Sequence, residues 1–170
     1  MWYDMIFHYG IKSLRRQMDK QPASRMCFVC GRQNPAGLKL DIYNDVERRE
    51  VRAEFILHEN YQGYPGVAHG GIVATILDEV AGRAVLLDGG PENLMVTLTL
   101  KVRYRRPTPT DTPLVVVGTL TQPGRSHAKV HGEIRLPDGS VTAESDAILA
   151  RPPDSVRESW ASEQQYWKIY

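Results

Sequence analysis

The sequence predicts an α+β fold in which a curved antiparallel sheet of about six strands wraps around one long central helix. Two stretches of alternating apolar and polar residues come first, a strongly apolar segment with helical period follows, and four further alternating stretches come last. The connections between the later stretches are short, which favours hairpins over parallel crossovers. An antiparallel sheet with a single helix must cover its apolar face with that helix.

Two strands are predicted before the helix. The first spans residues 38–42 and ends at a turn signal, Asn44-Asp45, and the second spans residues 51–57. In both, apolar residues occupy every second position, as in a strand with one buried face.

The central helix is predicted over residues 70–87. Its apolar residues cover well over half of the circumference at 3.6 residues per turn, whereas a surface helix shows a narrower stripe. We therefore expect it to be buried on most sides, and Gly89-Gly90-Pro91 to end it.

Four strands are predicted after the helix, over residues 96–105, 114–121, 128–136 and 141–149. Pro137-Asp138-Gly139 is a turn signal between the last two. A helix this apolar is best covered by a sheet that curls around it, and that architecture is the hotdog fold.

Length and charge exclude several classes of function. The chain has 170 residues, enough for one domain, and a formal net charge of +1, so no basic field would hold nucleic acid. No run approaches the ~18 apolar residues of a membrane span. Asp4 stands where a secretory signal carries positive charge, so we expect a cytoplasmic protein with reduced cysteines.

Three zones differ in composition. We expect an N-terminal extension over 1–25 that forms a short helix, a hotdog domain over 26–151, and a C-terminal tail over 152–170 that is helical. Eight of the 14 aromatic residues lie in the two end zones. Because disordered tails are poor in aromatics, we expect these ends to dock on the body or on a partner subunit.

Gly70 and Gly71 open the helical segment although glycine is a poor helix former. A backbone without Cβ atoms can be approached closely by a ligand. The first N–H groups of a helix lack intrahelical acceptors and carry the positive end of its dipole. They could bind the thioester oxygen that becomes negative during attack. Alternatively, the glycines only permit close packing of the helix on the sheet.

Asp78 lies at the edge of the apolar face of this helix, on the side of Gly71. A carboxylate there is costly unless it is paired or used, and it is a candidate general base; the alternative is a side chain that reaches solvent or caps a loop. Glu79 and Arg83 are expected to form a structural ion pair. His69 either orients a substrate or bonds to the backbone at a turn.

Cys27 and Cys30 form a Cys-x-x-Cys motif, which raises a zinc or redox reading. A structural zinc site needs four ligands, and the sequence has no second cysteine pair. The spacing of His8 and His58 gives no support. We therefore predict no metal and no cofactor.

The pattern Pro-Gly, then His-Gly-Gly, then an acid nine residues after the histidine resembles the hotdog-fold acyl-CoA thioesterases. The closer likeness is to the branch with the phenylacetate-pathway thioesterase and the mammalian thioesterase-superfamily members. Residues 27–31 with 34–38, and residues 96–99 leading to 104–107, resemble segments of that branch. The resemblance covers about residues 27–151.

This resemblance implies hydrolysis of an acyl-CoA thioester to the free acid and CoA. Gly70 and Gly71 would donate backbone N–H groups to the thioester oxygen, and His69 would help to orient that carbonyl. Asp78 falls on the family's catalytic carboxylate, a general base or a nucleophile. Thr97 would orient the attacking water from the partner subunit of a homodimer or a dimer of dimers.

One position departs from the family pattern. Relatives carry Asn or Gln six residues before the histidine, where this chain has Gly63. Gln62 or Asn60 is expected to substitute for that side chain.

The phosphates of CoA are expected to meet basic residues near the surface, Arg103 on a strand or the loop residues Arg125 and Ser126. Alternating charges on a strand are otherwise its solvated face.

Two other functions stay open at this point. One is a hydratase or dehydratase that acts on enoyl thioesters within the same fold. The other is a non-catalytic module that binds acyl-CoA.

Overall fold

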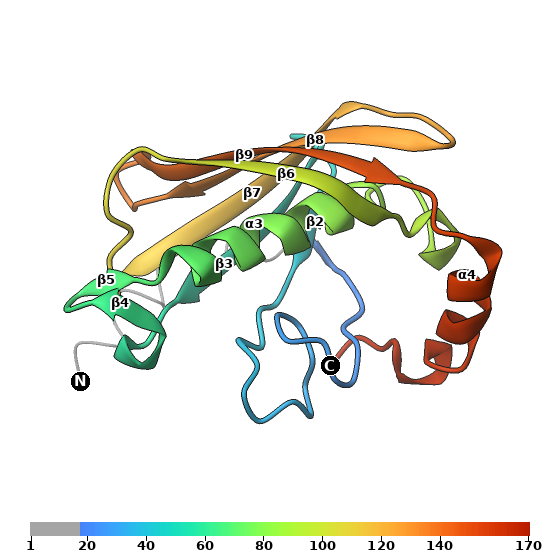
Figure 1. Ribbon diagram of the computed structural model, residues 1–170, viewed down its shortest axis with the longest axis horizontal. Helices are drawn as coiled ribbons and strands as arrows, with labels where there is room; N and C mark the ends of the chain where they lie inside the picture. Colours follow the sequence, from blue (N-terminus) through green and yellow to red (C-terminus); the bar gives the residue numbers. More distant parts are fainter. Residues whose placement is uncertain (1–17) are drawn as a thin grey trace.

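The computed structural model describes residues 18–170 and contains one antiparallel sheet of seven strands that curves over a central helix (Figure 1). The strand order is β1-β2-β3-β7-β8-β9-β6. The helix is α3 (Gly70–Ala84), and β4 and β5 form a separate hairpin before it. The strands are β1 (Asp19–Lys20), β2 (Tyr43–Asp45), β3 (Glu50–Ile56), β4 (Gln62–Tyr64), β5 (Val67–Ala68), β6 (Val96–Tyr104), β7 (Pro113–Gln122), β8 (His127–Arg135) and β9 (Val141–Ala150). The predicted α+β hotdog fold is confirmed.

Helix α3 packs along the concave side of the sheet and builds the core. Its buried apolar side chains are each at most 1% exposed; they are Val73, Ile76, Leu77, Val80, Ala81 and Ala84. Gly118 on β7 allows the closest approach, because a Cβ atom there would lie 2.7 Å from the carbonyl oxygen of Val80. The wide apolar surface that predicted a buried helix is therefore the surface that the sheet covers.

The helix is shorter than predicted and ends at Ala84 rather than at residue 87. Leu86 and Leu87 donate their N–H groups to the carbonyls of Arg83 and Ala84, three residues back, so the chain tightens into turns. Leu86 is still buried. The apolar pattern of the sequence therefore extends beyond the end of the helix, because the residues of these turns also pack on the core.

The first predicted strand is misplaced. Residues 38–42 are not in the sheet; β2 covers Tyr43–Asp45, where we expected a turn, and the turn follows at 46–49. Leu40 and Ile42 are buried, but they pair with loop segments: the Leu40 N–H bonds to the Val29 carbonyl, and the Ile42 carbonyl accepts from Gln21. Alternation here reflects burial without a strand ladder.

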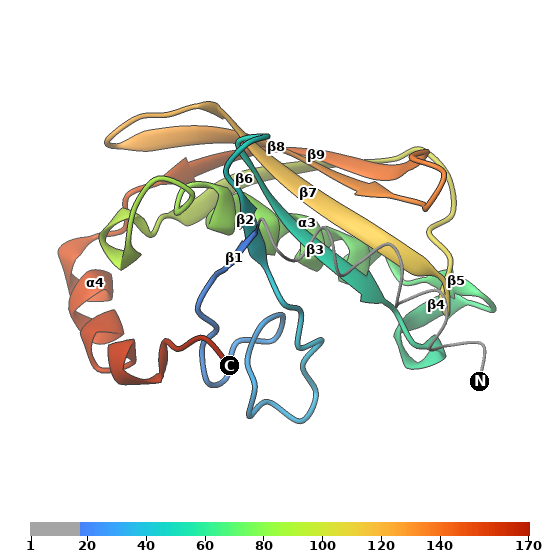
Figure 2. The same cartoon turned by 180° about the vertical axis from the view of Figure 1, so that it is seen from behind.

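The C-terminal segment forms α4 (Asp154–Ala161) and the short helix η3 (Gln164–Tyr166), and then returns to the start of the described chain (Figures 1 and 2). Ala23 and Lys168 exchange two backbone hydrogen bonds of 2.7 and 3.1 Å. Arg25 pairs with Glu163 at 2.9 Å and lies over the ring of Tyr166. The expected docking of the aromatic end is thus found for this tail, whereas the prediction for residues 1–17 lies outside the described residues.

Within residues 18–170, none of the helices combines the length and the hydropathy that crossing a bilayer requires.

Candidate active site

The start of α3 is organised by His69, which caps the helix. Its backbone is extended (φ −60°, ψ 133°), and its ring Nδ1 accepts a hydrogen bond from the Gly71 N–H at 3.0 Å. A neutral imidazole that accepts at Nδ1 carries its proton on Nε2. His69 is exposed, so this Nε2–H is a donor available to a ligand at the helix start.

The two glycines differ in what their amides do, which corrects the expectation that both donate to a substrate. The Gly71 N–H is taken by His69, and the Ile72 and Val73 amides both bond to the His69 carbonyl. Among residues 18–170, the Gly70 N–H has no hydrogen-bond partner. Gly70 therefore supplies the amide that remains for a ligand.

Tyr104, at the end of β6, holds this helix start in place. Its hydroxyl donates to the Gly70 carbonyl at 2.8 Å, and its hydroxyl oxygen and two ring carbons lie 3.4–3.6 Å from where a Cβ atom of Gly70 would be. The sequence pattern does not reveal this role, because Tyr104 is there only the last apolar residue of an alternating strand. A phenol at the end of a strand was the available signal, since its hydroxyl needs a partner.

Asp78 and Thr97 meet further along α3. Asp78 is half-buried, and the Thr97 hydroxyl at the start of β6 donates to its Oδ1 at 2.7 Å. Both residues belong to one chain, so this contact needs no partner subunit; the implied role of Thr97 across a dimer stays a prediction. The hydrogen bond fixes one carboxylate oxygen and leaves Oδ2 for another donor.

The two halves of the candidate site are separated along the helix. Asp78 follows Gly70 by eight residues, which at 1.5 Å per residue places it about 12 Å further along the axis. One thioester group cannot contact the Gly70 amide and the Asp78 carboxylate of the same chain.

The residues expected to replace the missing Asn or Gln lie near His69 but are partly engaged. The Gln62 side-chain oxygen accepts from the Gly66 N–H at 3.2 Å, and Asn60 lies exposed in the short helix η1 (Glu59–Tyr61). A Cβ atom at Gly63 would lie 3.3 Å from the His69 ring, so the departure from the family pattern leaves that ring uncovered. Their binding roles stay predictions.

Arg103 is matched within the sheet, because it pairs with Glu144 at 3.3 Å and Asp146 at 3.8 Å on β9. Arg125 and Ser126 lie exposed in the β7–β8 connection. Contact of these residues with CoA phosphates stays a prediction.

A hollow of about 250 Å³ lies elsewhere, between β2, β3 and residues 38–41. Its lining includes neither the glycines nor Asp78, so it does not belong to this site.

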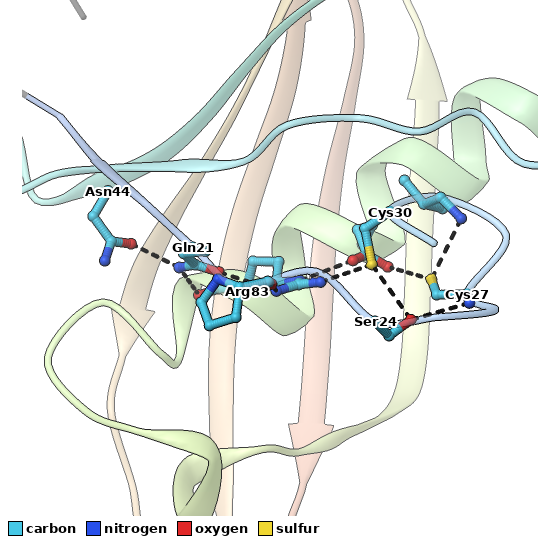
Figure 3. A network of polar contacts seen from close by, with 9 residues as sticks. Gln21, Ser24, Cys27, Cys30, Asn44 and Arg83 are labelled. Carbon is cyan, nitrogen blue, oxygen red and sulfur yellow. Dashed lines mark hydrogen bonds and ion pairs between the residues drawn. The ribbon is translucent and has the colours of Figure 1, made fainter. Parts of the chain in front are cut away.

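One group of possible metal ligands comes together in the described part of the chain: the Cys27 and Cys30 sulfurs and a Glu79 carboxylate oxygen lie within 4.8 Å of one another (Figure 3). The predicted Glu79–Arg83 ion pair is confirmed at 2.8 Å, and the Arg83 guanidinium also donates to the Cys30 sulfur at 2.9 Å. The buried Arg83 guanidinium therefore already forms hydrogen bonds with two of the three possible ligands, Glu79 and Cys30.

Comparison with known proteins finds the same fold and family pattern. Residues 65–143 match the family model described as Thioesterase superfamily. The chain is 30% identical over 111 residues to the uncharacterized mitochondrial membrane protein FMP10 of Saccharomyces cerevisiae, covering 64% of this chain and 46% of that protein. It is 36% identical over 74 residues to acyl-coenzyme A thioesterase THEM4 of Mus musculus, covering 44% and 30%. The chain thus spans less than half the length of these curated relatives.

Solved structures of thioesterase superfamily and related proteins have a similar fold. A thioesterase superfamily protein superposes with a TM-score of 0.68 at 31% identity, covering 75% of this chain and 61% of that one. The phenylacetic acid degradation-related protein of Ralstonia eutropha JMP134 gives 0.60 at 23% identity, covering 67% and 86%. A Streptococcus mutans UA159 protein bound to acetyl-CoA gives 0.55 at 21%, covering 59% and 79%. The last two likenesses concern the fold alone.

Proposed function

The chain belongs to the thioesterase superfamily with the hotdog fold, and we propose on this basis that it hydrolyses an acyl-CoA thioester to the free acid and CoA. The observation that carries the proposal is the Gly70 amide at the start of α3, which has no hydrogen-bond acceptor among residues 18–170 and lies next to the histidine that caps the helix. The name of the mouse relative, and the acetyl-CoA bound to the Streptococcus mutans protein, support CoA thioesters as the substrate class.

The helix start is the oxyanion site in this proposal. The Gly70 N–H and the Nε2–H of His69 donate to the thioester oxygen as it becomes negative. The positive end of the α3 dipole adds to the same stabilisation. Tyr104 holds the Gly70 peptide in position through its carbonyl.

Asp78 is the group that activates the nucleophile. Thr97 donates to Oδ1 and orients the carboxylate, so that Oδ2 can accept a proton from water while the water oxygen attacks the thioester carbon. The C–S bond then breaks and CoA leaves as its thiolate. Direct attack by Oδ2, with an anhydride that water hydrolyses, uses the same geometry.

A second copy of the chain completes the site in this proposal. About 12 Å along the helix axis separates Gly70 from Asp78, so the helix start of one protomer must face the carboxylate of the other. Strand β6 lies at an edge of the sheet, next to α3, and its Leu98 is 59% exposed. Pairing of two such edges about a two-fold axis gives a homodimer with two shared sites, and a dimer of dimers keeps them.

The test is release of free thiol from a panel of acyl-CoA substrates. Gly70→Pro is a sharp variant, because proline is favoured at the first helical position and the extended backbone of His69 suits a residue before proline. It removes one donor, so we expect kcat to fall about 10²–10³-fold. Gly70→Ala keeps the N–H and is the matched control. Asp78→Asn should abolish turnover.

Unchanged turnover in Gly70→Pro would remove that amide from the mechanism. Addition of water to an enoyl-CoA without thiol release would instead identify a hydratase. Binding of acyl-CoA with neither reaction would identify a binding module.

A further inference from the structure

The Cys27–Cys30 segment is a built turn that the proposed hydrolysis does not use. The Gly31 N–H closes the turn on the Cys27 carbonyl at 2.9 Å, and a Cβ atom at Gly31 would lie 2.3 Å from that oxygen, so only glycine fits. The Val29 N–H donates to the Cys27 sulfur at 3.3 Å, and the Cys27 N–H donates to the Ser24 hydroxyl at 3.0 Å. The backbone therefore holds the two sulfurs on one side of the turn, within 4.8 Å of each other.

A buried cation faces the second sulfur. The Arg83 side chain is only 4% exposed, and it donates to Cys30 at 2.9 Å, to Glu79 at 2.8 Å and to the Pro22 carbonyl at 2.7 Å (Figure 3). The ring of Trp167, from the docked tail, covers its guanidinium at 4.6 Å. Such a cation stabilises a thiolate over a thiol.

The pKa values of the two thiols shift in opposite directions. The hydrogen bond from Cys27 and the Arg83 charge together outweigh the opposing effects of burial and Glu79, and the pKa of Cys30 is lowered to about 6. The same hydrogen bond, with burial and the nearby Glu79 carboxylate, raises the pKa of Cys27. The surroundings therefore favour a thiolate at Cys30 over one at Cys27.

The Arg83 charge also favours a pair of metal-free cysteines over a metal site at Cys27, Cys30 and Glu79. A divalent cation bound to both sulfurs and Glu79 would lie beside a guanidinium that is held by four oxygen or sulfur acceptors and covered by Trp167. Two positive charges, the metal ion and the guanidinium, would then lie side by side in a buried site and repel each other strongly. The positive charge that a metal would supply is already there.

We propose that Cys27 and Cys30 form a reversible disulfide by exchange with small-molecule disulfides of the glutathione class. Cys27 is the entry point because it is partly exposed, whereas Cys30 is 2% exposed. Once its proton has moved to Cys30, the Cys27 thiolate attacks the incoming disulfide and expels one thiolate, which takes the proton from Cys30. The Cys30 thiolate then attacks the Cys27 sulfur and expels the second. The protein loses two electrons, and the small disulfide becomes one thiol and one thiolate.

The experiment equilibrates the full chain with graded ratios of oxidised to reduced glutathione. Samples are quenched with acid and alkylated under denaturing conditions, and the intact mass is measured. The chain has two cysteines, so each species is unambiguous. We expect both thiols to disappear in a single transition, with no glutathione retained on the protein.

Single variants assign the two roles. Cys30→Ser should retain one glutathione on Cys27, because the resolving thiolate is gone. Cys27→Ser is the matched variant, and its buried Cys30 should react at least about tenfold more slowly. Thiolate ultraviolet absorbance should titrate near pH 6 in the wild type and lose this step in Cys30→Ser.

Two results would overturn the proposal. One is a wild-type protein that keeps both thiols, or carries stable glutathione adducts, at every ratio. The other is one zinc ion per chain that protects both cysteines from alkylation until a chelator removes it. Neither measurement depends on acyl-CoA hydrolysis, so the proposed function can fail without affecting this result.

Discussion

The carboxylate of Asp78 has one hydrogen-bond partner in the described chain, the Thr97 hydroxyl at 2.7 Å. A hydrogen bond to a charged group contributes about 1.5–3 kcal/mol, so its loss should lower kcat roughly 10–100-fold. Thr97→Val keeps the side-chain shape and removes the hydroxyl, whereas Thr97→Ser restores it. We expect kcat to fall and KM to change little in Thr97→Val. A wild-type kcat in Thr97→Val, with a loss of kcat in Thr97→Ser, would show that the shape of Thr97, not its hydroxyl, matters.

A pH-dependent contribution to stability is expected at His131 on β8. Burial opposes its charged form, but hydrogen bonds with Asp146 (2.9 Å) and Glu133 (3.3 Å) outweigh that effect and raise its pKa. A raised pKa in the folded state gives stability that is complete below the unfolded value, about 6.5, and is lost as pH rises through the folded value. Because the ring is 35% exposed, the effect should stay below about 1 kcal/mol.

The measurement is urea unfolding of wild type and His131→Gln from about pH 5.5 to 8.5, a range that spans the usual histidine pKa. The difference in unfolding free energy should shrink as pH rises. A difference that is constant with pH would mean that the ring stabilises the sheet by packing alone.

At the scale of the elements, two glycines on facing elements give opposite predictions. Gly82 lies on α3 with nothing within 4 Å of an added Cβ atom, whereas Gly118 on β7 faces the Val80 carbonyl at 2.7 Å. Gly82→Ala should stabilise the protein by about 0.4–1 kcal/mol, because alanine is the better helix former. Gly118→Ala should destabilise it by about 1–3 kcal/mol, because the strand and helix must separate. Denaturant midpoints measure both, and a stable Gly118→Ala would disprove the close packing.

The elements that sequence analysis predicted well are those whose burial has a regular period. Helix α3 and strands β3, β6, β7, β8 and β9 each place one face on the core, so apolar spacing reveals them. Residues 38–42 share that spacing and are buried against loops, which period alone cannot distinguish from a strand.

The candidate site was only partly predictable for a related reason. The glycine pair and Asp78 follow from spacing on a helix. The difference between the Gly70 and Gly71 amides depends on the orientation of the His69 ring, and the role of Tyr104 depends on where β6 ends in space. Neither the ring orientation nor the position of the strand end leaves a periodic pattern in the sequence.

At the scale of the whole molecule, the described chain holds two half-sites, one at the start and one near the middle of helix α3, and the proposed function requires two chains to join them. This arrangement separates the defects of two variants. Gly70→Pro damages only the oxyanion half, and Asp78→Asn damages only the carboxylate half. In a mixed dimer, one shared site then carries both substitutions, and the other carries neither.

Subunit mixing therefore tests the shared site directly. Each variant alone should be nearly inactive, but an equal mixture that is co-expressed or refolded together should recover roughly a quarter of wild-type activity, since half of randomly formed dimers are mixed and each has one intact site. Mixing Asp78→Asn with Thr97→Val is the control, because both changes fall in the same half-site and neither mixed site is intact. No recovery in the first mixture, while the proteins exchange subunits, would place each complete site within a single chain. Recovery in the control equal to that of the first mixture would show that Asp78 and Thr97 do not act in the same half-site.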